Sequence, residues 1–91
     1  MVVARRYGVR GRVQGVGFRY FTQQAADADG IHGWVRNTGD GHVVIEAEGE
    51  FEALMRFETR VRQGPPGARV DAVDVDEMIP TGRATGFAVR G

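Results

Sequence analysis

The chain contains no cysteine, no serine and no lysine. The lack of cysteine excludes disulfides, thiolate metal sites and thiol redox chemistry. The three absences together exclude the side chains most often used as covalent nucleophiles. No apolar run approaches the roughly 20 residues that a membrane-spanning helix needs, and the opening MVVARRY lacks the long apolar segment of a secretory signal. We therefore expect a soluble protein of the cytoplasm.

The chain also lacks net charge, because twelve arginines balance twelve acidic residues. This balance argues against a dedicated nucleic-acid-binding protein. The charges are nevertheless unevenly placed: residues 1–36 carry six arginines and two acids, and residues 37–91 carry six arginines and ten acids. The positive first part is suited to attract a small anion. We expect residues 1–91 to form one domain whose small core leaves room only for a surface crevice as the site.

Two periodicities alternate along the chain. A period of two residues predicts strands at residues 4–13, 32–38, 42–48, 70–78 and, as a short final strand, 86–90. The helical period predicts helices at residues 18–29 and 50–63. In the first helix, Phe18, Phe21, Ala25 and Ala28 form the expected core-facing stripe. We interpret the order as β-α-β-β-α-β, an α+β fold of the ferredoxin-like type: a two-layer α/β sandwich with two helices on one face of a four-stranded antiparallel sheet.

The sequence G-R-V-Q-G-V-G-F-R at residues 11–19 joins the first strand to the first helix. Gly15 and Gly17 let the backbone approach a ligand closely, and unpaired N–H groups at a helix start bind anions. Tyr20 stands where a dinucleotide-binding G-x-G-x-x-G motif needs its third glycine, and the ending of a Walker loop is missing. The two glycines alone also fit a tight strand-to-helix connection. Arg19 favours the anion site, because a cation at a helix N-terminus is unfavourable unless an anion joins it.

Asn37, the only asparagine, stands between a strand and a T-G-D-G turn. It is either a turn-forming residue or a carboxamide that holds a water molecule.

His32 and His42 lie ten residues apart and in no metal-binding spacing, so we predict no metal site and no cofactor. Trp34 is expected to pack in the core or at a sheet edge. The alternating acids of residues 71–77 disfavour an RNA-binding sheet.

Two segments resemble the signatures of the acylphosphatase family. Residues 11–19 match its G-x-V-Q-G-V-x-F-R signature, and G-W-V-R-N at residues 33–37 matches its G-W-V-x-N signature. The segments G-P-P-G-A-R-V at 64–70 and G-F-A-V at 86–89 also fit, so the resemblance covers essentially the whole chain. It implies hydrolysis of acyl phosphates to a carboxylate and inorganic phosphate by a small monomer that needs no metal. We also expect no cofactor, and the charge balance and the short apolar runs lead us to expect no nucleic-acid partner and no membrane binding.

The resemblance also implies the roles of individual residues. Arg19 binds the phosphoryl group and Asn37 orients the attacking water. Backbone N–H groups surround the same phosphoryl group, and they belong to Gly15, Val16, Gly17, Phe18 and Arg19. This chemistry needs no covalent nucleophile, because water can attack the phosphorus directly. It needs no general acid either, because the carboxylate that leaves is a weak base, whose conjugate acid has a pKa of ~4. The alternative is a non-catalytic phosphate- or anion-binding module on the same fold, which would not need Asn37.

Overall fold

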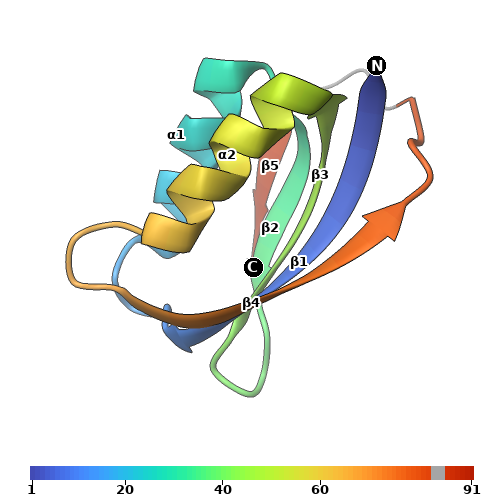
Figure 1. Cartoon of the computed structure of the whole chain (residues 1–91). Helices are drawn as coiled ribbons and strands as arrows, with labels where there is room; N and C mark the ends of the chain where they lie inside the picture. The colour runs from blue at the N-terminus through green and yellow to red at the C-terminus, as the bar shows by residue number, and fades with distance from the viewer. Residues whose placement is uncertain (83–85) are drawn as a thin grey trace.

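A computed structural model describes residues 1–82 and 86–91 of the chain. Within that part, two helices cover one face of a sheet, and its other face is open (Figure 1). The elements, in chain order, are β1 (Val2–Arg12), α1 (Phe18–Asp29), β2 (His32–Asn37), β3 (Val43–Glu50), α2 (Phe51–Gln63), β4 (Arg69–Met78) and β5 (Phe87–Arg90). The two-layer α+β sandwich expected from the sequence is thus confirmed.

The sheet differs from the expected one in its number of strands. Its order is β4-β1-β3-β2-β5, and the first four strands are antiparallel neighbours as expected. β5 adds a fifth strand, parallel to β2, with Gly33 opposite Phe87. The chain leaves β4 at one edge of the sheet and places β5 at the other edge, where β5 runs in the same direction as β2. The expectation of a purely antiparallel four-stranded sheet was therefore wrong.

The core fills the space between the helices and the covered face of the sheet. Its fully buried side chains come from both layers and include Tyr7, Val9, Phe18, Val35, Ile45, Leu54 and Phe57. The core-facing stripe predicted for α1 was partly wrong. Ala28, which was expected to face the core, is exposed, whereas Thr22 and Ala26, which were not included, are buried. Thr22 tolerates burial because its hydroxyl donates a hydrogen bond of 2.8 Å to the carbonyl of Phe18.

The strand directions bring two distant segments of the sequence together. β1 and β2 both run antiparallel to β3, which lies between them. Their carboxyl ends therefore lie at the same end of the sheet. The loop after β1, which leads into α1 at Gly17, and Asn37, the last residue of β2, are neighbours for this reason.

Candidate active site

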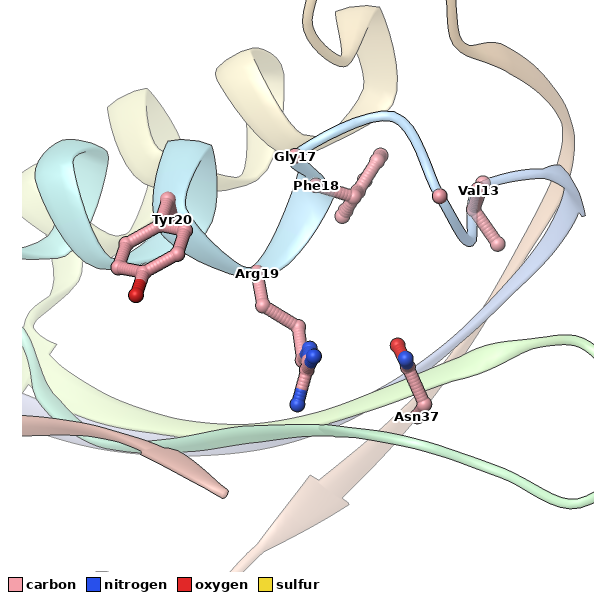
Figure 2. Close-up of a pocket in the computed structure, with 7 residues that line it drawn as sticks. Val13, Gly17, Phe18, Arg19, Tyr20 and Asn37 are labelled. Carbon is pink, nitrogen blue, oxygen red and sulfur yellow. The ribbon is translucent and has the colours of Figure 1, made fainter. Parts of the chain in front are cut away.

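An open hollow of about 160 Å³ lies where the loop after β1 enters α1 and where β2 ends (Figure 2). Side chains and backbone from both segments line it. The lining residues are Val13, Gly15, Gly17, Phe18, Arg19, Tyr20 and Asn37. Four of the backbone positions predicted from the sequence, and both predicted catalytic side chains, thus share one hollow. Val16, the remaining predicted position, does not line it, and its side chain packs against the core.

The loop before α1 leaves the start of the helix open. Gly15 and Gly17 have φ angles of 74° and 76°, in the left-handed region that favours glycine. Gly17 is the N-cap residue, no side chain caps this helix end, and the first turn contains no acidic residue. The first bond of the helix runs from the N–H of Phe21 to the carbonyl of Gly17 at 3.0 Å. The N–H groups of the three preceding residues therefore need partners from outside the helix, and the positive end of the helix dipole favours an anion there.

Arg19 extends from the first turn of α1 into the hollow (Figure 2). Its Nη1 donates a hydrogen bond of 2.7 Å to the backbone carbonyl of Arg90, in β5. Among the residues that the structure describes, no carboxylate forms an ion pair with Arg19. A guanidinium has five N–H donors, so the contact with Arg90 orients the group and leaves donors for a ligand. The positive charge of Arg19 is thus available to an anion in the hollow.

Asn37 faces Arg19 across the hollow (Figure 2). As the last residue of β2 it lies opposite Val43 in the antiparallel pair with β3. The turn between these strands is held by Thr38, whose N–H donates to the carbonyl of His42 at 2.9 Å. The Thr38 hydroxyl also donates to Asp40, and this bond, together with the nearby His42, holds the pKa of the Asp40 carboxyl below its usual value. The carboxamide of Asn37 therefore projects from a well-bonded strand end.

Gln14 is a residue of this region to which the sequence assigned no role. Its Nε2 donates to the carbonyls of Thr38, at 2.9 Å, and His42, at 2.8 Å. Gln14 thereby joins the loop before α1 to the turn that follows Asn37. The position of this glutamine inside the first signature was the only sign of its importance, because the two carbonyls lie 24 and 28 residues away in the sequence.

The two histidines do not form a metal site with one another. His32 lies opposite Glu48 in the β2–β3 pair, whereas His42 is at the turn, 3.4 Å from the carboxylate of Asp40. Across residues 1–82 and 86–91, no three side chains of the metal-binding types gather into a cluster that could hold an ion. In the same residues, neither helix is long and apolar enough to cross a membrane.

Comparisons with known proteins agree with these observations. The sequence profile of the acylphosphatase family matches residues 5–89. An acylphosphatase of Oceanobacillus iheyensis is 49% identical over 86 residues, which cover 93% of this chain and 94% of the relative. An acylphosphatase of Thermotoga petrophila is 51% identical over 79 residues, covering 87% of this chain and 88% of the relative. The crystal structure of acylphosphatase from Bacillus subtilis has a TM-score of 0.93, 42% identity and 100% coverage of both chains.

The family match over residues 5–89 includes the loop, the start of α1 and the end of β2, and therefore both segments that resembled the family signatures. The resemblance inferred from the sequence is confirmed. This chain belongs to the acylphosphatase family and is a hydrolase that acts on acyl phosphates.

Proposed function

We propose that the hollow at the start of α1 is the site at which this enzyme binds and hydrolyses its acyl phosphate. Arg19 and Asn37 are the catalytic residues in this proposal. The backbone N–H groups that hold the phosphoryl oxygens are those of Gly15, Val16, Gly17, Phe18 and Arg19. The observation that carries the proposal is that one hollow combines an arginine that pairs with no carboxylate of residues 1–82 and 86–91, a helix start without a side-chain cap, and a carboxamide.

Phosphate binding follows from the charges at this end of α1. The helix start and the guanidinium of Arg19 both favour an anion, and the contact with the carbonyl of Arg90 fixes where the guanidinium lies. Transfer of a phosphoryl group passes through a loose transition state, for which positioning and neutralisation of the oxygen charges supply most of the catalysis. Arg19 and the backbone N–H groups supply both.

The hydrolytic step then needs only an oriented water molecule. The Oδ1 of Asn37 accepts a hydrogen bond from the water, whose oxygen attacks phosphorus as the bond between phosphorus and the acyl oxygen breaks. The acyl oxygen keeps the bonding electron pair and leaves as a carboxylate, and both protons of the water end on the phosphate. No general acid is required, because the leaving carboxylate is a weak base. The same proposal covers a metal-independent monomer in the cytoplasm.

Two substitutions separate binding from turnover. We expect Arg19→Ala to lower kcat/KM for benzoyl phosphate by about 100-fold or more, because it removes a charge-assisted donor at the transition state, and to abolish competitive inhibition by inorganic phosphate. We expect Asn37→Ala to lower kcat by a similar factor, while the inhibition constant of phosphate changes less than about threefold. Steady-state assays with a chelator present measure both.

Arg60→Ala is the matched control, because Arg60 is an exposed arginine on α2 that does not line the hollow. It should leave both constants unchanged. A simple phosphate monoester should be a poor substrate, because its alkoxide leaving group is strongly basic and the residues that line the hollow include no carboxylic acid and no histidine to protonate it. Full activity of Asn37→Ala would contradict the water-orienting role. Phosphate inhibition without measurable hydrolysis of benzoyl phosphate by the wild type would instead be the behaviour of the non-catalytic anion-binding module.

A further inference from the structure

Tyr20 is a large, exposed aromatic residue at the rim of the hollow. It is the third residue of α1, it is 70% exposed, and it lines the hollow beside Arg19. The buried residues of α1 lie on another face of the helix, so the ring of Tyr20 does not pack in the core. The other large apolar residues that the structure describes as exposed, Met1, Val2, Phe51 and Ile79, do not line this hollow. Packing therefore gives no reason for an aromatic ring here.

The position of Tyr20 relative to Asn37 has a consequence for catalysis. Figure 2 shows Arg19 between Tyr20 on one side and Asn37 on the other. In a phosphoryl transfer the attacking and leaving oxygens lie roughly in line on opposite sides of phosphorus. If Asn37 holds the attacking water, the acyl group leaves on the side away from Asn37. That is the side on which Tyr20 stands.

We infer that Tyr20 contacts the acyl group of the substrate and makes this enzyme prefer acyl phosphates with an aromatic or extended apolar acyl group. This inference rests on the proposed function of Arg19 and Asn37. An aromatic ring offers a flat apolar face to an aroyl or alkyl chain, and such ring contacts favour binding by about threefold to tenfold. An acetyl group is too short to cover the ring. Since the proposed contact is made by the ring and not by the hydroxyl, we expect Tyr20 to add little to the affinity for the phosphoryl group itself.

The inference is tested with Tyr20→Ala and Tyr20→Phe on benzoyl phosphate and acetyl phosphate. We expect Tyr20→Ala to lower kcat/KM for benzoyl phosphate by about threefold to tenfold, with a change of less than about twofold for acetyl phosphate and for the inhibition constant of inorganic phosphate. Tyr20→Phe keeps the ring and should behave as the wild type on both substrates. Phe51→Ala, which removes an exposed aromatic ring far from the hollow, is the matched control and should change none of these constants.

The outcomes separate this inference from the proposed function. Suppose that the wild type is active. If Tyr20→Ala then leaves kcat/KM for benzoyl phosphate unchanged, or lowers kcat/KM equally for both substrates, the role of Tyr20 alone is overturned. A weakened phosphate inhibition in Tyr20→Ala overturns it as well, because the ring would then serve the phosphoryl site. A wild type that hydrolyses neither substrate overturns the proposed function together with this inference. Since Tyr20 is mostly exposed, its variants should fold, and their circular dichroism spectra should match that of the wild type.

Discussion

Gln14 connects the two halves of the hollow at the level of single atoms. Its Nε2 is within hydrogen-bond distance of two carbonyls at the turn that follows Asn37, while its own backbone belongs to the loop that leads into α1. The distance between the loop that we propose binds phosphate and the carboxamide of Asn37 therefore depends on this side chain. In the proposed site Gln14 is therefore expected to be a positioning residue, since it does not itself line the hollow.

We expect Gln14→Leu to lower kcat/KM for benzoyl phosphate by about tenfold or more, because small misplacements of catalytic groups are costly. The inhibition constant of inorganic phosphate should change less than about threefold, since Arg19 and the helix start remain. The free energy of unfolding should fall by about 1–2 kcal/mol for the lost hydrogen bonds. Enzyme kinetics and urea unfolding check these values. Gln24→Leu, at an exposed position on α1, is the control, and an equal effect in both variants would contradict the positioning role.

Trp34 illustrates the limit of residue-by-residue interpretation. The sequence indicated packing in the core or at a sheet edge, and its neighbour Val35 does lie in the core. Trp34 instead points to the open face, where the guanidinium groups of Arg6, Arg36 and Arg90 lie 5.9, 5.7 and 4.9 Å from the ring centroid. Each distance is within the range of a cation–π contact. These arginines are 28, 2 and 56 positions away, so no local pattern in the sequence reveals the cluster.

At the scale of elements, the pairing of β2 with β3 depends on a single glycine. Gly33, which opens the second signature, has a φ angle of 146°. A Cβ atom at this position would lie 1.9 Å from the backbone carbonyl oxygen of Glu46 in β3. Only glycine permits this approach of the two backbones. The register that places Asn37 at the end of β2 follows from the same pairing.

We expect Gly33→Ala to lower the free energy of unfolding by about 3 kcal/mol or more, because the strand must shift or adopt strained dihedral angles. Chemical unfolding followed by circular dichroism measures the loss. Gly39→Ala is the control, since Gly39 lies in the turn after β2 and a Cβ atom there meets nothing within 4 Å. Equal unfolding midpoints for the two variants would contradict the role assigned to Gly33.

Most of the elements could be predicted from periodicity, and their bounds agree with the structure within two residues. The periodicity arises because each element buries one face against the same core. The parallel docking of β5 could not be predicted in this way, because a four-residue strand reveals neither its partner nor its direction. The hollow is an intermediate case: the glycine-rich loop and Arg19 are local features, whereas the contact of Arg19 with Arg90 joins residues 71 positions apart.

At the scale of the whole molecule, one ionic network joins the sheet to α2. Nη1 of Arg5 and the hydroxyl of Tyr7 donate to Oε1 of Glu58, at 2.8 and 2.9 Å. Burial raises the pKa of the Glu58 carboxyl, but the hydrogen bonds from Arg5 and Tyr7 outweigh burial and hold this pKa below its usual value. Burial, and then the charge of Glu58, raise the pKa of the Tyr7 hydroxyl. The folded state therefore favours a charged Glu58 and a neutral Tyr7.

This network predicts how stability depends on pH. A carboxyl whose pKa is lower in the folded state stabilises the protein above its unfolded pKa, about 4.3 for glutamate, and this contribution is lost as pH falls through the folded pKa. We expect Glu58→Gln to lower the free energy of unfolding by about 1–3 kcal/mol at pH 7. The difference from the wild type should shrink as pH falls from about 4.3 towards 3.

Urea unfolding of the wild type and Glu58→Gln at pH 7 and pH 3 measures this difference. Asp76→Asn, which removes an exposed carboxyl on β4, should cost little at either pH. A Glu58→Gln difference that stays constant between the two pH values would rule out the lowered pKa of Glu58 as its source.

The bond between Arg19 and the carbonyl of Arg90 has a consequence for biosynthesis. Ribosomes add residues in order, so β5 is the last of the described strands to emerge. A nascent polypeptide that has reached residue 82 already contains the glycine-rich loop, Arg19 and Asn37, yet its guanidinium still lacks the carbonyl that orients it. In the proposed site, Arg19 therefore gains its orienting contact only when translation has delivered β5 to the sheet.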